Sequence, residues 1–221
     1  MKIILFGATG DAGRAALDAA TRRGHQVTAV ARRPGAATPQ VTPLALDLLA
    51  EPEAAARAAL GHDIVVSTLR PPAGREPDLV PLTRAALDAA RAAGIPALIT
   101  GGAATLKLAD GSGHTVLSAP GFLPDEVRPI AEACAAQDAL LASETGVQWT
   151  CLRPPAMLFH GPATGDFRFG TDTLVTDETG ASQISFADFG AALISLAENP
   201  QRRGQRLTVG WGTAATAPAA S

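Results

Sequence analysis

Short apolar runs rich in β-branched residues alternate along the chain with longer stretches rich in Ala, Leu and Arg. The first kind of run is typical of strands buried on both faces, and the second is typical of the helices that cover them. Strands are predicted at residues 2–6, 26–31, 41–46, 63–69, 96–100 and 147–152, with a last edge strand at 206–209. Helices are predicted at 11–23, 51–60, 77–93 and 125–144, and from a capping box at 185–188 to residue 199. This alternation predicts an α/β fold, a Rossmann-type doubly wound parallel sheet.

Two stretches do not fit the alternation. Residues 101–124 are rich in Gly, Ala and Ser, and residues 154–182 are rich in Gly, Thr and Asp. Both follow predicted strands, and loops beyond the carboxyl ends of the strands form the ligand crevice of such a sheet. We expect a small cap over a substrate; mobile surface loops are the alternative. The chain is expected to form one domain over residues 1–212, followed by a disordered tail at 213–221 that is rich in Ala, Thr and Pro.

Three glycines spaced three apart separate the first predicted strand from the first predicted helix. Gly7 suits a tight exit from the strand, Gly10 lacks the Cβ that would block a phosphate, and Gly13 lets the helix pack closely. The free N–H groups and the positive end of the helix dipole then face the phosphates. The expected contacts are Gly7, Ala8, Thr9, Gly10, Asp11, Ala12, Gly13 and Arg14. The order of strand, glycines and helix indicates a dinucleotide site, and a glycine-rich structural turn is the alternative.

The end of the second predicted strand indicates which dinucleotide is bound. An NAD site has a carboxylate near this point, which accepts hydrogen bonds from the ribose hydroxyls. This chain has Arg32 and Arg33 there, with no acid, and Arg14 is able to join them. Guanidinium groups suit the 2′-phosphate of NADP(H). We therefore predict NADP(H) rather than NAD(H); solvated surface arginines are the alternative.

Further cofactor contacts are expected where the other strands end, on positional grounds alone. They are Asp47 and Leu48 at the adenine, Ser67, Thr68 and Leu69 along the cofactor, Thr100, Gly101 and Gly102 at the nicotinamide ribose, and Pro154, Pro155 and Ala156 at the nicotinamide pocket. The alternative for each group is an ordinary strand terminus.

Composition narrows the classes of partner. A formal net charge of −3 over 221 residues gives no reason to expect nucleic acid or an anionic membrane. No basic segment precedes an apolar run, and no apolar run approaches the roughly 18 residues of a membrane span, so we expect a cytoplasmic protein. Cys134 and Cys151 are too few for a disulfide framework and are not spaced like metal ligands, so no metal is expected.

Five short motifs together resemble the atypical short-chain dehydrogenase/reductases. They lie at residues 7–14, 31–34, 100–103, 149–155 and 184–189. Among these proteins, the chain is most similar to the NmrA-like and biliverdin-reductase-B-like NAD(P)H-binding proteins, over essentially its whole length. The resemblance implies a Rossmann fold, bound NADP(H) and often the reduction of a flavin, a quinone or a similar acceptor. Some members of this group only sense the cofactor.

The chain departs from this resemblance in its catalytic residues. Typical short-chain reductases use a Tyr-x-x-x-Lys pair to protonate a carbonyl oxygen, and that pair would lie on the predicted helix at 125–144. The chain has no tyrosine, and its only lysines are Lys2 and Lys107. Ketone reduction by this pair is therefore excluded.

Any catalysis must take its proton from another group or from water. Hydride transfer to a flavin-like or quinone-like acceptor leaves a stabilised anion that solvent protonates, so positioning is the main requirement. The polar candidates are Thr105, Ser118 and His160, with His114 as a weaker one. Turn-capping hydroxyls and solvated imidazoles are the alternatives. An aromatic wall for a planar ligand, or else the core of the cap, is expected from Phe122, Phe159, Phe167 and Phe169.

The leading hypothesis is an NADPH-dependent reductase that lacks the Tyr/Lys pair and acts on a small planar redox-active acceptor such as a flavin or quinone. A non-catalytic NADP(H)-binding sensor, which responds to the redox ratio through a partner, is the second hypothesis. An epimerase- or dehydratase-type enzyme is the third, and the missing Tyr and Lys weigh against it. We expect a small-molecule substrate and a monomer or homodimer.

Overall fold

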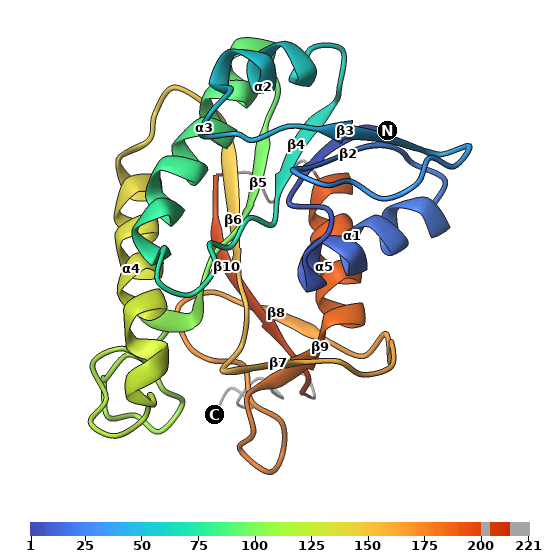
Figure 1. Ribbon diagram of the computed structural model, residues 1–221. Helices are drawn as coiled ribbons and strands as arrows, with labels where there is room; N and C mark the ends of the chain where they lie inside the picture. The colour runs from blue at the N-terminus through green and yellow to red at the C-terminus, as the bar shows by residue number, and fades with distance from the viewer. Residues whose placement is uncertain (200–203, 213–221) are drawn as a thin grey trace.

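The computed structural model describes residues 1–199 and 204–212, and the predicted tail at 213–221 lies outside this range. An eight-stranded sheet forms its centre (Figure 1). The strands, in spatial order, are β3 (Val41–Ala45), β2 (Gln26–Ala31), β1 (Lys2–Phe6), β4 (Ile64–Ser67), β5 (Ala97–Thr100), β6 (Trp149–Arg153), β10 (Arg206–Gly210) and β8 (Arg168–Gly170). Neighbouring strands are parallel, except for the antiparallel pair of β10 and β8. The order reverses between β1 and β4, which confirms the predicted doubly wound Rossmann fold.

Helices cover both faces of the sheet (Figure 1). One face carries α1 (Asp11–Arg22) and α5 (Phe186–Glu198), and the other carries α2 (Pro52–Ala59), α3 (Leu79–Ala93) and α4 (Arg128–Ser143). Each face buries its own apolar cluster, with Phe189 and Leu193 of α5 in the first and Leu87 and Leu141 in the second. These two buried layers are the reason that the strands read as continuous apolar runs.

Small residues bring α1 and α5 together. A Cβ on Gly190 would lie only 2.4 Å from the carbonyl carbon of Ala15, so the two helix backbones nearly touch there. Ala16 and Ala192 are fully buried beside this point. The contact fixes the helix that begins at the glycine turn against the rest of the fold.

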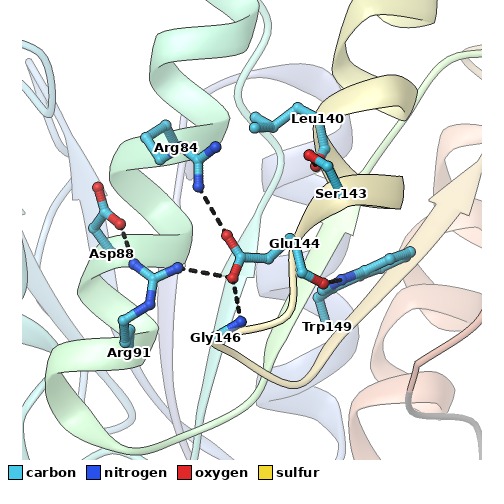
Figure 2. A network of polar contacts seen from close by, with 8 residues as sticks. All are labelled: Arg84, Asp88, Arg91, Leu140, Ser143, Glu144, Gly146 and Trp149. Carbon is cyan, nitrogen blue, oxygen red and sulfur yellow. Dashed lines mark hydrogen bonds and ion pairs between the residues drawn. The ribbon is translucent and has the colours of Figure 1, made fainter.

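On the other face, Glu144 joins α3 to the end of α4 (Figure 2). Its carboxylate accepts a hydrogen bond from Arg84 Nη1 at 2.8 Å and one from the Gly146 N–H at 2.6 Å, and pairs with Arg91 Nη2 at 2.9 Å. Arg91 also pairs with Asp88. Burial raises the pKa of Glu144, but the hydrogen bonds from Arg91 and the Gly146 N–H lower it by more than burial raises it. The net pKa lies below the ordinary value, so the carboxyl is held ionised.

Two predicted helices begin later than expected. Residues Glu76–Asp78 and Asp125–Val127 form 3-10 turns, and the α-helices start at Leu79 and Arg128. Proline at 77 lies within the first of these turns, and proline at 129 is the second residue of α4, where its missing N–H needs no helical partner. The predicted helix ends are close to those observed. Gly94, for example, ends α3 as its C-cap with a left-handed φ of +68°.

The stretch at 154–182 is not a loop throughout. It contains β8, which covers β10, so that the strand predicted at the edge is an interior strand. It also contains β7 (Met157–Phe159), which pairs in parallel with β9 (Gln183–Ser185) in a separate two-stranded sheet. Each of these strands has three residues, which is too short for a hydrophobic pattern to reveal it.

Asp188 at the start of α5 holds this stretch in place. Its carboxylate accepts hydrogen bonds from the Thr164 N–H at 3.0 Å, the Gly165 N–H at 2.9 Å and the Trp211 Nε1–H at 2.7 Å. The predicted cap of α5 is confirmed on one side, because Ser185 Oγ accepts from the Asp188 N–H at 3.0 Å. The acidic residue of that capping box instead orders the segment that leads to β8.

Candidate functional site

A cleft of about 1150 Å³ opens where the parallel strands end. Its walls include residues that follow β1, β2, β3, β4, β5 and β6, together with one side of α4. This is the position at which a doubly wound sheet binds its ligands, outside the carboxyl ends of the strands and across the reversal of strand order.

The glycine turn after β1 is built by close backbone contacts. Gly7 has a φ of +84°, and its N–H donates to the carbonyl of Val30 at 3.0 Å. A Cβ on Gly13 would lie 2.1 Å from the carbonyl oxygen of Gly7. Thr68 Oγ1 donates to the carbonyl of Phe6 at 3.0 Å, which joins the turn to the end of β4. Gly7 and Gly13 are therefore required by the protein's own packing.

Gly10 differs from the other two glycines. It is the N-cap of α1 with an ordinary φ of −73°, and a Cβ there would approach only the carbonyl oxygen of Gly7, at 3.6 Å. No side chain caps the helix at this point. The first turn of α1 therefore presents free N–H groups and open space to the cleft, which fits a pyrophosphate group.

Charges on the adenine side of the cleft favour a phosphate. Arg32, after β2, lines the cleft and is exposed, and none of the described residues forms an ion pair with it. Asp47, after β3, also lines the cleft, but its Oδ1 accepts from the Leu49 N–H at 3.0 Å and the Ala50 N–H at 3.3 Å. The cleft wall after these two strands therefore carries a guanidinium with no ion pair among the described residues and a carboxylate whose Oδ1 already accepts two backbone N–H groups.

Most of the predicted cofactor residues come together on the cleft wall. Those that line it are Gly7, Thr9, Gly10, Asp11, Ala12, Arg32, Asp47, Leu48, Thr68, Leu69, Thr100, Gly101, Gly102, Pro154, Pro155 and Ala156. Those outside the lining are Ala8, Gly13, Arg14, Arg33 and Ser67. Ala8 and Ser67 are buried in the fold beneath the cleft, and the side chains of Arg14 and Arg33 are exposed elsewhere.

Thr105 lies behind the cleft, in a buried polar network. Its Oγ1 donates to Asp138 Oδ2 at 3.0 Å and accepts from Arg153 Nη1 at 3.2 Å. Asp138 also accepts from Arg206 at 3.1 Å, and Arg153 donates to the carbonyl of Thr171 at 2.6 Å. The hydroxyl therefore links α4, β6 and the 154–182 segment, and acts as a positioning group.

The other two catalytic candidates are exposed. Ser118 Oγ accepts from the Thr115 N–H at 2.9 Å; Val116 in the same turn lines the cleft, but Ser118 does not. His160 Nε2 lies 3.5 Å from Asp11 Oδ1, and its ring lies against Phe186 with centroids 4.9 Å apart. Since Asp11 and Phe186 both line the cleft, His160 stands at its rim.

Of the four phenylalanines predicted to form an aromatic wall, only Phe122 lines the cleft. Phe122 lines the cleft and is 40% exposed. Phe159 packs edge-on against Trp211, and Phe167 packs edge-on against Phe169. Phe167 and Phe169 also pack against the core cluster on the α1 and α5 face of the sheet, and neither they nor Phe159 line the cleft.

The sequence prediction missed Arg70 and the cleft-facing side of α4. Arg70 directly follows the predicted strand-end residues, so extending that rule by one position would have found it. On α4, the residues that line the cleft are Ile130, Ala131, Cys134 and Gln137, and their helical spacing was the available signal.

Cys134 lies on the helix where a Tyr-x-x-x-Lys pair was sought. A Cβ on Gly102 would lie 2.4 Å from its Sγ, so the thiol packs directly on the end of β5. Burial raises the pKa of Cys134 to about 11, and the charge of Arg70 opposes part of that shift. The thiol is therefore protonated near neutral pH and is a poor nucleophile.

The residues that the structure describes form neither a metal site nor a membrane-spanning helix. No group of three or more His, Cys, Asp or Glu side chains among them is arranged to hold a metal ion. No helix in the same part of the chain is long and apolar enough to cross a membrane.

The chain is similar in sequence and in structure to known proteins. A family described as NAD(P)H-binding matches residues 7–200. Three solved structures superpose on nearly the whole chain, and each covers 96% of it. The first, a "putative exported protein" from Burkholderia pseudomallei, is 36% identical with a TM-score of 0.85 and is covered over 100% of its length.

The other two structures have names that suggest enzymes. A "putative epimerase" from Bacteroides thetaiotaomicron is 29% identical, with a TM-score of 0.87 and 98% of its length covered. A "putative NADH-flavin reductase" from Streptococcus pneumoniae is 27% identical, with a TM-score of 0.81 and 99% of its length covered.

Proposed function

The chain belongs to the NAD(P)H-binding family, and from this premise we propose that it is an NADPH-dependent reductase of a small planar redox-active acceptor such as a flavin or quinone. The observation that carries the proposal is the cleft itself. It combines an open helix N-terminus at Gly10, a free guanidinium at Arg32 and a second half lined largely by apolar side chains.

The preference for NADPH over NADH rests on Arg32. Its guanidinium has no acid to neutralise it among the described residues, whereas the nearby carboxylate of Asp47 is occupied by backbone N–H groups. A 2′-phosphate gains a charge-assisted hydrogen bond from this arrangement. NADH would leave Arg32 solvated, and the Oδ1 atom of Asp47 already accepts two backbone N–H groups, which weakens this carboxylate as an acceptor for the ribose hydroxyls.

The residues of the second half of the cleft hold and orient an acceptor. Phe122, Leu123, Val127 and Ile130 line it from the loop before α4 and from α4 itself. They offer a flat apolar surface and exclude water, which is what a planar ring needs to stack near the end of β5. Bound NADPH supplies the hydride for such a ring.

The proposed reaction does not require a dedicated proton donor in the protein. A reduced flavin or quinone anion takes its proton from solvent, so the absence of a Tyr/Lys pair is compatible with turnover. His160, at the rim, is the side chain we propose to orient the acceptor or relay a proton. Ser118 remains a candidate only if the 101–124 region moves toward the cleft.

The proposal also covers the subfamily, the domain organisation, the location and the oligomeric state of the protein. We place the protein with the NmrA-like and biliverdin-reductase-B-like members of its family, as a single domain over residues 1–212 that works in the cytoplasm as a monomer or homodimer. The name of the Streptococcus pneumoniae structure supports the choice of a flavin as acceptor.

A second function is favoured by one specific observation. The side of α4 that lines the cleft carries apolar residues, a protonated thiol and Gln137, whose Nε2 donates to Thr83 Oγ1 at 2.9 Å. A cleft without an acid–base group at this place suits a sensor that binds NADP(H) and signals through a partner. An epimerase, as the Bacteroides thetaiotaomicron structure is named, needs such a group and is the weaker alternative.

One experiment separates reductase from sensor. Purified protein is mixed with NADPH and, in turn, with riboflavin, FMN and menadione while nicotinamide absorbance is followed. Oxidation that is lost in Gly10→Val, a variant that fills the phosphate cradle, supports the reductase. Tight NADPH binding with no oxidation by any acceptor contradicts it and favours the sensor.

A further inference from the structure

Among the residues that the structure describes, six charged side chains line the cleft, and four of them have partners within the protein. They are Asp11, Arg32, Asp47, Arg70, Arg75 and Asp78. Asp11 lies 3.5 Å from His160, Arg75 pairs with Asp78, and Asp47 accepts from backbone N–H groups. Within residues 1–199 and 204–212, Arg32 and Arg70 form no ion pair. The cleft therefore offers two free cations.

The two cations stand on opposite sides of the glycine turn. Arg32 follows β2, on one side of β1, and Arg70 follows β4, on the other. A dinucleotide crosses such a sheet with its adenosine half toward β2 and its nicotinamide half toward β4 and β5. Arg32 is thus placed for the 2′-phosphate, and Arg70 is placed beside the reacting end of the cofactor.

The position of Arg70 relative to α4 supports this placement. Burial raises the pKa of the Cys134 thiol, and the positive charge of Arg70 lowers it in part. Cys134 packs on Gly102 at the end of β5. The guanidinium therefore lies within electrostatic range of the wall that holds the acceptor.

The loop that follows Arg70 makes contacts of its own. Pro71 is buried directly after it, and the Arg75 N–H donates to the carbonyl of Pro72 at 3.0 Å. Glu76, the acid whose pKa responds to Arg70, uses its carboxylate to accept from the Gly74 N–H at 2.8 Å. None of these contacts uses the guanidinium of Arg70, which is exposed and lines the cleft.

We propose that Arg70 binds a phosphate group on the acceptor, so that the substrate is a planar ring with a phosphorylated side chain. This inference rests on the proposed reductase function. The apolar wall around Phe122 and Ile130 takes the ring, and Arg70 takes the anionic end. An exposed guanidinium gains more from a dianionic phosphate than from a carboxylate, because the Coulomb energy scales with the product of the charges. Arg70 would then set substrate specificity without taking part in hydride transfer.

The test uses two flavins that differ only in a phosphate, FMN and riboflavin, with the full-length protein and saturating NADPH. For the wild type we expect a KM for FMN about 10-fold or more below that for riboflavin, the size of one charge-assisted hydrogen bond. Arg70→Gln should remove most of this difference by raising the KM for FMN more than the KM for riboflavin. Arg70→Lys, which keeps the charge, should restore part of it.

A matched control is available on α4. Arg128 is exposed and lies in sequence between the lining residues Val127 and Ile130, without lining the cleft itself. Arg128→Gln removes the same charge and should leave the FMN preference intact. If Arg128→Gln abolishes the preference as fully as Arg70→Gln does, the effect is one of net charge and the inference is overturned.

Flavin binding in the presence of NADP⁺, followed by fluorescence quenching, separates this inference from the proposed function. Protein that oxidises NADPH with both flavins and shows no FMN preference overturns the inference and leaves the reductase standing. Protein that binds NADPH but neither flavin overturns the inference, and it overturns the reductase as well if menadione also fails to oxidise NADPH. If Arg70→Gln weakens NADPH and NADH binding equally, Arg70 contacts the cofactor pyrophosphate, and the inference is again overturned.

Discussion

The carbonyl oxygen of Gly7 lies where a side chain on Gly13 would have to go, because a Cβ there would approach it to 2.1 Å. The same construction at Gly10 meets nothing closer than 3.6 Å. One glycine motif therefore contains two kinds of glycine. Gly13 is required for the strand and helix to pack, and Gly10 is required only when a ligand occupies the cradle.

This difference predicts opposite effects for two alanine variants. Gly13→Ala should lower the free energy of unfolding by about 3 kcal/mol or more, because backbone atoms must move. Gly10→Ala should cost about 1 kcal/mol or less, yet weaken NADPH binding at least about 10-fold. Thermal unfolding and NADPH titration measure the two quantities. Gly10→Ala protein with wild-type affinity for NADPH would show that the cradle holds no phosphate.

Thr105→Val should act on stability rather than on chemistry. The change removes the hydroxyl that links Asp138 to Arg153 and leaves both buried groups short of a partner, at a cost of about 2 kcal/mol. Thr105→Ser keeps the hydroxyl and should recover most of that loss. Denaturant unfolding of both variants gives the answer. A Thr105→Val protein of normal stability that fails only in turnover would assign Thr105 a direct role instead.

Glu144→Gln should destabilise the protein in a manner that depends on pH. The hydrogen bonds from Arg91 and the Gly146 N–H outweigh burial and hold the pKa of Glu144 below its ordinary value of 4.5. Its contribution to stability is therefore fully present above pH 4.5 and is lost as the pH falls through the lower folded-state value. The arginines are partly exposed, so we expect a loss of about 1–2 kcal/mol at pH 7.

Urea unfolding of wild type and Glu144→Gln at pH 7 and in the acid range tests this prediction. The two curves should converge as the pH falls. A gap that widens in acid would mean that the pKa of Glu144 is raised. Glu53→Gln is a suitable control, because Glu53 is 91% exposed in its ion pair with Arg57 and its loss should have little effect.

Cys134 should react slowly with alkylating reagents. Its pKa of about 11, against an ordinary 9.0, lowers the thiolate fraction near neutral pH by roughly 100-fold. Iodoacetamide labelling followed by mass spectrometry should therefore accelerate steadily with pH up to about 11. Saturating NADP⁺ should slow the reaction further, since the thiol lines the cleft. Rapid labelling at pH 7 would contradict a protonated thiol.

The pattern of the chain was sufficient to predict the parallel strands of the sheet, its helices and most of the residues on the side of the cleft next to the glycine turn. These depend on local signals, such as the apolar run before Gly7 and the arginines after β2. The strand at Arg168–Gly170 escaped prediction because three residues carry no measurable period. The buried link from Thr105 to Asp138 escaped it because the partners are 33 positions apart, and only the tertiary fold brings them together.

The substrate half of the cleft was the least predictable part. Its wall draws on Arg70 after β4, Phe122 in a loop and Cys134 on α4, and no motif connects these positions. The strand-end rule and the helical spacing on α4 indicate Arg70 and Cys134 one at a time, and only the tertiary fold brings them to the same wall.

The central claim is that Arg32 makes this cleft a site for NADPH. It is tested most directly by titrating NADPH and NADH into the wild type, Arg32→Ala, Arg33→Ala and the double variant. We predict that the wild type binds NADPH about 10- to 100-fold more tightly than NADH, and that Arg32→Ala removes the difference by weakening NADPH alone. Arg33→Ala, outside the cleft lining, should have a much smaller effect. Equal affinity of the wild type for the two cofactors, or NADPH binding unchanged in the double variant, would contradict the claim.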